Sequence, residues 1–210
     1  MPRMSVDEER TRQLRQQKQQ QREALRERIL EVSRGIVRSE GLASLSMRKL
    51  ADAIDYSPAA LYLHFQSRGE IARALREEGH AQLRTAFAPY TGIADAAARL
   101  KAIGRAYVEF GLAERETYRL MFMEDAGAAG TSASDSGAAM LSLIANAFSE
   151  LRAANRLGRV APDAAPAACA QAFWANLHGI VALELSGAAL PGTPAVELIE
   201  LSLDAWLAAC

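Results

Sequence analysis

Apolar residues recur at helical spacing in two short, adjacent stretches of the N-terminal third of the chain. The first set is Leu45, Leu50, Ala51 and Ile54, and the second is Ala60, Leu61 and Phe65. Ser46 and Ser57 are each placed to cap the helix that follows, and Pro58 suits a first helical position because it lacks an N–H. The pattern predicts a helix, a tight turn and a second helix within residues 44–68, which is a helix-turn-helix.

Two helices this short need a third helix behind them, and the preceding residues supply it. From Arg22 the apolar positions draw one stripe along a helix that ends near Glu40-Gly41; they are Leu25, Ile29, Val32, Ile36 and Val37. Gly41 suits the left-handed conformation that often follows a helix. We expect this stripe to cover both short helices and close a small core.

The rest of the chain has helical periodicity and little strand signal. A long helix is predicted from Ser67 to about Phe87, before Pro89 and Gly92. Further helices are expected at 93–113, 116–124, 138–155, 162–185 and 194–209, with a flexible loop at 125–137. The prediction is an all-α protein, with an N-terminal helix-turn-helix domain and a C-terminal helical bundle.

The last two predicted helices are apolar on more than one face. A helix with this pattern must be buried on nearly all sides, but the final helix of a small bundle has solvent on one of them. The spare face therefore predicts a homodimer through the last two helices of each protomer. Small residues would permit close helix approach; they are Ala167, Ala168, Ala170, Ala175 and Gly179.

Charge separates the two halves of the chain. Residues 10–49 hold eleven basic and four acidic residues, whereas the chain from residue 81 holds nine basic and thirteen acidic ones. A basic N-terminal part followed by an acidic C-terminal part is expected of a protein that binds phosphate groups through one domain only. Residues 1–21 are polar and rich in Gln and Arg, so we expect a flexible basic arm, helical near its end. Such an arm lies along a duplex or enters the minor groove, and a solubilising tail is the alternative.

No apolar run long enough for a membrane span or signal peptide occurs, so we expect a cytoplasmic protein. Cys169 and Cys210 form no metal or disulfide pattern. The sequence also lacks the familiar hydrolase, nucleotide and zinc motifs, and its three histidines are far apart. We therefore expect no catalytic site, no metal and no cofactor.

The segment LRERILEVSRGIVRSEGLASLSMRKLADAIDYSPAALYLHFQSRGEI resembles the DNA-binding domain of the TetR family of bacterial transcriptional regulators. The match runs without a gap from Leu25 to Leu75. It departs from the family at Asp55, where Gly is usual, and at Tyr56, where a small aliphatic is usual. Asp tolerates the left-handed region, so the turn survives, and the Tyr56 ring is expected to fill the space between the helices.

The resemblance divides the chain into residues 1–21, a flexible basic arm; 22–68, the DNA-binding domain; 69–90, a connecting helix; and 91–210, a ligand-binding and dimerisation domain. In the family the connecting helix is the lever that changes the separation of the two DNA-binding heads. The stretch containing Trp174, His178 and Gly179, and YRLMF earlier, also resemble the Trp-His-Gly type of C-terminal domain in this family.

A recognition helix presents its N-terminal residues to base edges in the major groove. Here those residues are Ser57, Pro58, Ala59 and Ala60, which offer apolar contact to a thymine methyl but no bidentate base contact. By resemblance, Arg48 reads guanine; a phosphate contact or a solvated side chain are its alternatives. Resemblance also gives phosphate contacts to Tyr62, His64 and Arg68, and the helix capped by Ser46 directs its N-terminal amides at the DNA backbone.

Aromatic and sulfur side chains gather on the predicted bundle helices. We expect a pocket for an apolar or aromatic effector, lined by Tyr107, Phe110, Tyr118, Phe122, Phe148, Trp174 and His178. The alternative is ordinary core packing at each position, and for His178 a hydrogen-bonded core or interface histidine.

These expectations combine into a ligand-responsive regulator, most simply a homodimeric repressor that a small molecule releases from a palindromic DNA operator. An enzyme is the first alternative, but it would not require an Arg-rich arm beside a helix-turn-helix. The second is an interaction module that has kept the fold and lost DNA binding, which the small Pro58-Ala59-Ala60 surface would suit. Salt-dependent affinity for DNA separates these alternatives, because phosphate contacts release counterions.

Overall fold

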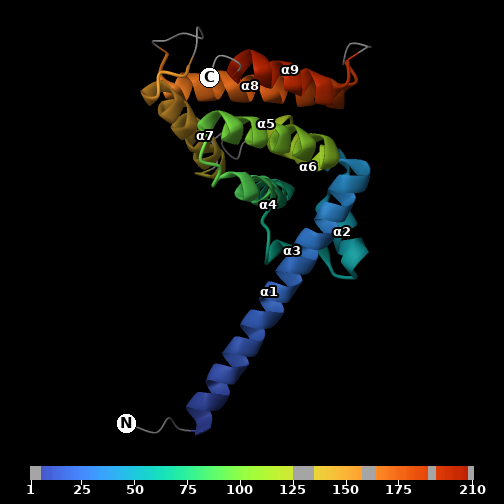
Figure 1. The fold of residues 1–210 in the computed structure, drawn as a ribbon. Helices are drawn as coiled ribbons and strands as arrows, with labels where there is room; N and C mark the ends of the chain where they lie inside the picture. Colours follow the sequence, from blue (N-terminus) through green and yellow to red (C-terminus); the bar gives the residue numbers. More distant parts are fainter. Residues whose placement is uncertain (1–5, 125–134, 158–163, 189–192, 208–210) are drawn as a thin grey trace, which may run out of the picture. The chain divides into compact units, whose positions relative to one another are not determined.

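The computed structural model describes residues 6–124, 135–157, 164–188 and 193–207. Over these ranges the chain forms nine α-helices and two short 3₁₀ turns, with no strand, which confirms the all-α class (Figure 1). The chain divides into two compact units, the first running to Leu75 and the second starting at Arg76. No helix in the described ranges is long and apolar enough to span a bilayer.

The first unit consists of α1 (Val6–Glu40), α2 (Met47–Ile54), α3 (Pro58–Tyr62) and the start of α4 (Arg68–Phe87). Its core is formed by side chains that are fully or almost fully buried; they include Ile29, Leu45, Leu50, Leu61, Phe65 and Ile71. The cap predictions are confirmed, since the Ser46 hydroxyl accepts from the Lys49 N–H at 3.1 Å and the Ser57 hydroxyl from the Ala60 N–H at 3.3 Å. Ser67 caps α4 in the same way, accepting from the Glu70 N–H.

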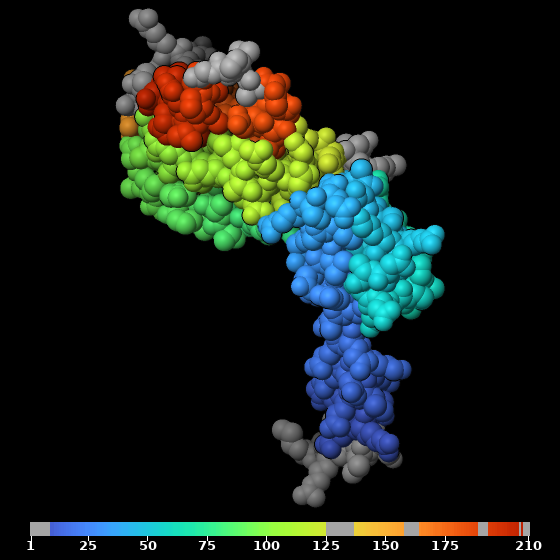
Figure 2. Space-filling view, turned by 90° about the vertical axis from the view of Figure 1, so that its right-hand side faces the viewer, coloured from blue at the N-terminus to red at the C-terminus, as the bar shows by residue number. Residues whose placement is uncertain are grey.

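Helix α1 is longer than the sequence predicts. Residues 6–21, assigned to a flexible arm, continue the same helix as one 35-residue element, while residues 1–5 lie outside the described ranges. Residues 9–24 are exposed throughout (Figure 2). The extension lacks an apolar stripe, and its helical form follows from the high helix propensity of Gln, Arg and Glu.

The turn between α2 and α3 is built around Asp55, which adopts the left-handed conformation at φ 59° and ψ 46°. The expectation that the Tyr56 ring fills the space between these helices is wrong, because its side chain is 49% exposed. Ile54 and Leu61 are buried and already fill that space. The larger ring therefore stays at the surface, on the side of α1.

The second unit consists of the rest of α4 with α5 (Ala96–Ala113), α6 (Arg115–Phe122), α7 (Asp135–Ala153), α8 (Pro166–Ser186) and α9 (Ala195–Leu207). Each falls where the periodicity places it, apart from small shifts at the ends. Most of the predicted loop at 125–137, residues 125–134, lies outside the described ranges. Helix α4 contributes residues to both units, whereas the sequence treats 69–90 as a separate segment.

Close packing and ion pairs hold the second unit together. A Cβ at Gly111 of α5 would lie 2.6 Å from Val181 Cγ1 and 3.0 Å from the Tyr118 ring, so only glycine lets α6 and α8 approach α5 this closely. Lys101 pairs with Asp204 at 2.7 Å, which links α5 to α9, and Arg99 pairs with Glu150 at 2.6 Å, which links α5 to α7. These contacts fix the helices around the aromatic core.

Candidate nucleic-acid interface and buried aromatic cluster

The residues expected to contact DNA lie on α2, α3 and the first turn of α4. Seven of them are exposed, namely Ser46, Arg48, Ser57, Pro58, Ala59, Tyr62 and Arg68, while Ala60 and His64 are half-buried. Five of them lie on two short helices, α2 and α3, which Ser46 and Ser57 cap and whose opposite faces are buried, while His64 follows α3 and Arg68 begins α4. The small side chains of Pro58, Ala59 and Ala60 leave the N-terminal turn of α3 open to close approach by another molecule.

His64 follows α3 and lies near two arginines of α1. Burial, followed by the positive charges of Arg22 and Arg26, lowers the pKa of the His64 imidazole. Arg22 donates to the Leu63 carbonyl at 3.5 Å, and the Arg26 guanidinium lies 4.3 Å from the centre of the Phe65 ring. Basic side chains of α1 are therefore brought beside the C-terminal end of α3.

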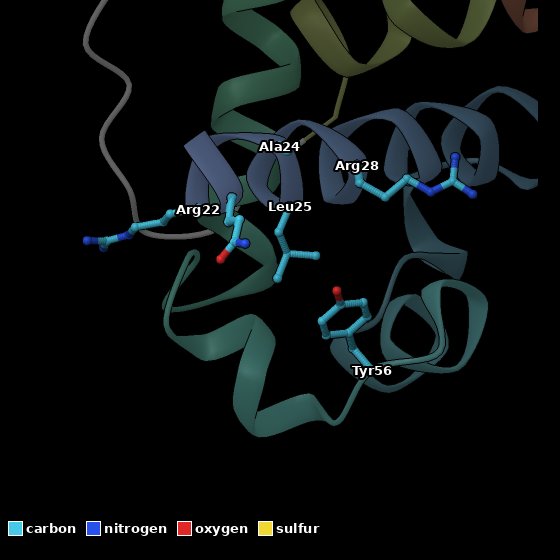
Figure 3. A pocket seen from close by; sticks show the side chains of 6 residues that line it. Arg22, Ala24, Leu25, Arg28 and Tyr56 are labelled. Carbon is cyan, nitrogen blue, oxygen red and sulfur yellow. The ribbon is translucent and has the colours of Figure 1, made fainter. Parts of the chain in front are cut away.

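An open groove of about 630 Å³ lies between α1 and the turn after α2, lined by Gln21, Arg22, Ala24, Leu25, Arg28 and Tyr56. Figure 3 shows Leu25 and Tyr56 pointing toward one another, with Arg22 and Arg28 extending to either side. Two arginines beside an aromatic ring suit an anionic or planar group. The sequence did not identify this groove because Tyr56 was expected in the core.

A cluster of rings in the second unit is centred on Phe122 of α6. Its centroid lies 4.9 Å from that of Tyr118, 6.2 Å from Tyr107, 6.0 Å from Trp174 and 5.7 Å from His178. The Trp174 and His178 rings are stacked at 5.2 Å. The structure thus brings together five of the seven residues expected to line an effector pocket.

Hydrogen bonds join three members of this cluster in a chain. The Tyr107 and Tyr118 hydroxyls lie 2.9 Å apart, and the Tyr118 hydroxyl lies 2.6 Å from His178 Nδ1. Burial lowers the pKa of His178, and burial raises the pKa of both tyrosines. All three groups are therefore neutral at pH 7. In the Nε2–H tautomer of His178, Nδ1 accepts from Tyr118, which leaves the Tyr118 oxygen to accept from Tyr107.

Trp174 contributes a donor to the same cluster. Its Nε1 is buried and has no hydrogen bond of normal geometry within the described residues. The indole N–H nevertheless lies close enough to the Tyr107 hydroxyl to oppose, in part, the rise in the pKa of Tyr107. A buried donor of this kind favours a ligand oxygen. The cluster therefore combines apolar ring surface with a donor able to hold one acceptor atom.

The sequence analysis did not include His80 in the cluster, and two residues that it did include, Phe110 and Phe148, pack elsewhere in the core. His80 of α4 is buried and meets the Phe122 ring edge-on at 5.6 Å; its burial lowers its pKa. Phe148 packs edge-on against Phe173, and Phe110 is buried in the face of α5. Helical spacing shows that these side chains point inward, but it does not show which of them meet.

Helices α8 and α9 lie side by side (Figure 1), and apolar side chains on both are left uncovered. Four large apolar side chains are exposed there, Leu183 at 51%, Val196 at 67%, Leu198 at 38% and Leu201 at 60%. On α8, Ala167, Ala168 and Ala175 are also exposed, and a Cβ at Gly179 would meet nothing within 4 Å. This surface has the small and apolar residues that suit helix-on-helix contact.

Comparisons with known proteins agree with this architecture. The family model described as bacterial regulatory proteins, tetR family, matches residues 29–75, and that described as tetracyclin repressor-like, C-terminal domain, matches residues 100–206. No curated protein matches the chain. A solved structure of a protein of unknown function from Rhodococcus sp. RHA1 is 29% identical with a TM-score of 0.74, over 88% of this chain and 94% of that one.

Two more distant structures share the fold. A bacterial regulatory protein in the tetR family from Rhodococcus RHA1 is 18% identical with a TM-score of 0.66, over 88% of this chain and 95% of that one. AibR in complex with isovaleryl coenzyme A and operator DNA is 17% identical with a TM-score of 0.63, over 87% of this chain and 97% of that one.

Proposed function

The chain belongs to the TetR family of bacterial regulatory proteins, and from this premise we propose that it is a homodimeric repressor released from a palindromic operator by a small apolar or aromatic molecule. The observation that carries the proposal is the exposed side of the first unit. There two serine-capped helices present Arg48, Tyr62 and the N-terminal turn of α3 together, while their other faces are buried. We also propose that it acts in the cytoplasm, where its DNA is.

Within this proposal the residues on and beside α2 and α3 make two kinds of contact with DNA, some to the bases and some to the phosphates. Arg48 has the length and the fork of donors to read guanine in the major groove. Ser57, Pro58, Ala59 and Ala60 let the backbone of α3 come close to the bases. Ser46, Tyr62, His64 and Arg68 hold the phosphates, through hydroxyl, imidazole and guanidinium groups and the capped amides of α2.

The uncovered surface of α8 and α9 supports the homodimer. Exposed Leu183, Val196, Leu198 and Leu201 would be removed from water by a second copy of the same surface, and the small residues of α8 let the backbones approach. A two-fold pair of first units would then meet two half-sites about one helical turn apart, roughly 34–36 Å.

The ring cluster around Phe122 supports an effector site. The proposed ligand has an apolar or aromatic body that replaces ring contacts, and an oxygen that accepts from Trp174 Nε1 or from the imidazole of His178. A structural relative, AibR, is described in complex with isovaleryl coenzyme A and operator DNA, so this fold accommodates both kinds of partner.

Helix α4 would carry the response. It is a continuous helix from Arg68, which we place at the DNA backbone, to Phe87, and its His80 packs against Phe122. A ligand that moves the Phe122 ring would therefore shift α4. DNA affinity would fall by the coupling free energy, typically about 1–3 kcal/mol.

The test is selection of bound sequences from a random duplex pool at near-physiological salt, using the purified full chain. Recovery of a palindrome with half-sites about one turn apart is expected. Arg48→Ala should then relax base preference at one position of each half-site, whereas Tyr62→Phe should weaken binding to all duplexes alike. A folded protein that recovers no sequence would contradict the proposal and favour an interaction module without DNA binding.

A further inference from the structure

The exposed half of α1 carries a row of basic side chains, here called the basic stripe, at Arg12, Arg15, Lys18, Arg22 and Arg26. Their spacings of three, three, four and four residues place them on one side of a helix. All five are exposed. Over 14 residues the row extends about 21 Å at 1.5 Å per residue.

The inner end of the basic stripe is fixed in place against the recognition helix. Arg22 donates to the carbonyl of Leu63, which follows α3, and Arg26 lies over the ring of Phe65. Both arginines act on His64, one of the proposed phosphate contacts. The row therefore begins beside the proposed DNA surface and follows α1 away from it.

The middle of the row has no acidic residues beside it. Residues 10–22 include five basic residues and no acidic one, so i,i+4 ion pairs, the usual support of an exposed helix, do not form within this stretch. None of the ion pairs among the described residues involves Arg12, Arg15 or Lys18. On the opposite side of the helix Gln13, Gln17 and Gln20 are neutral, and Arg10 is the one charge there within residues 10–22. The cationic charge of this stretch is therefore concentrated on one side, which is complementary to a single polyanion.

We propose that the basic stripe binds the phosphate backbone of DNA outside the half-site that α3 contacts, and so lengthens the footprint on each side. The inference rests on the proposed DNA binding and adds to it a second contact surface. About 21 Å corresponds to roughly six base pairs at 3.4 Å each. Because the contacts are to phosphate, they raise affinity without adding base preference.

The experiment compares two duplexes that share the selected palindrome. The short duplex ends at the outer bases of the half-sites, and the long one continues for about eight base pairs on each side, which exceeds the length of the stripe. Binding of the full chain is measured over a range of salt concentrations. We expect the slope of log affinity against log salt to be steeper on the long duplex by about 2–3 per protomer, at about 0.9 per phosphate contact.

Two charge-matched variants test the residues. In R12Q/R15Q/K18Q the outer stripe loses three charges, and the long duplex is expected to bind with the affinity and salt slope of the short one. In Q13E/Q17E/Q20E the net charge changes by the same amount on the opposite side, and most of the advantage of the long duplex should remain. Gln and Glu have helix propensities close to those of Arg and Lys, so α1 stays helical in both, which circular dichroism checks.

The outcomes separate the two proposals. If the wild-type chain binds the short and long duplexes equally, the stripe makes no contact with DNA and the inference is wrong, although DNA binding itself stands. If both variants lose the same affinity for the long duplex, the net charge of α1 and not the position of the stripe explains the binding, and the inference is wrong. If the wild-type chain recovers no palindrome and shows no salt-dependent affinity for either duplex, the proposed function fails as well.

Discussion

Replacing Tyr118 by phenylalanine removes one oxygen atom from the centre of the hydrogen-bonded chain in the second unit. That oxygen lies 2.9 Å from the Tyr107 hydroxyl and 2.6 Å from His178 Nδ1, so two hydrogen bonds are lost together. The Tyr107 side chain is only 1% exposed, so water does not readily replace the missing acceptor. The variant therefore leaves the buried Tyr107 hydroxyl without an acceptor for its proton, while the half-buried His178 retains access to solvent.

The expected loss in free energy of unfolding is about 1.5–4.5 kcal/mol. The bond to the half-buried His178 contributes about 0.5–1.5 kcal/mol net, and leaving the buried Tyr107 donor without an acceptor costs about 1–3 kcal/mol. Tyr107→Phe is the matched control, because it deletes one oxygen at the end of the chain and leaves the bond from Tyr118 to His178 intact. It should cost about 1 kcal/mol.

The assay is urea unfolding followed by tryptophan fluorescence, which reports the second unit alone because both tryptophans, Trp174 and Trp206, lie in its part of the chain. The double variant Tyr107→Phe/Tyr118→Phe should be less destabilised than the sum of the single variants, since the hydroxyl that Tyr118→Phe leaves unpaired is no longer there. Equal losses for the two single variants, or strict additivity, would refute the hydrogen-bond chain as described.

Three further perturbations follow from the structure. Asp55→Gly should raise the free energy of unfolding of the first unit by up to about 1 kcal/mol, because residue 55 has a positive φ that glycine adopts without strain; hydrogen exchange in α2 measures it. Burial lowers the pKa of His80 and His178 below 6.5, so the unfolded chain binds more protons than the folded one as pH falls. The second unit should therefore lose stability between about pH 7 and pH 5, measured by urea titration at each pH, and His178→Asn should reduce this loss. Leu201→Glu should turn the dimer into a monomer in light scattering, and Gly179→Leu should do the same without destabilising the protomer, since a Cβ there has no atom of the described residues within 4 Å; a dimer that survives both would place the interface elsewhere.

Local sequence signals account for the parts of the fold that were predicted well. Ser46, Ser57 and Pro58 act on the residues directly after them, so their effect can be inferred without knowing the tertiary structure. Apolar spacing identified the buried faces of the helices for the same reason. The left-handed conformation of Asp55 was expected because the family that the segment resembles usually has Gly at this position, and Asp tolerates the same conformation.

The errors concern features that depend on the packed structure rather than on local spacing. Tyr56 lies at the surface because Ile54 and Leu61 already occupy the space between α2 and α3. His80 joins the ring cluster through Phe122, which is 42 residues away in sequence, so no local pattern marks it. Residues 6–21 have no apolar stripe, and their helical structure continues from the packed part of α1.

The exposed N-terminal half of α1 is expected to be the part of the protein that responds first to a rise in temperature. Residues 9–24 are held in helical form by their own backbone hydrogen bonds, on a helix that the packed half of α1 has already nucleated. Helix propagation weakens on warming, so the outer turns fray from the Val6 end well before either unit unfolds. Arg12, Arg15 and Lys18 share one side only while these turns persist. Ellipticity at 222 nm should therefore decline gradually below the main thermal transition, and the outer charges should lose their alignment over the same range.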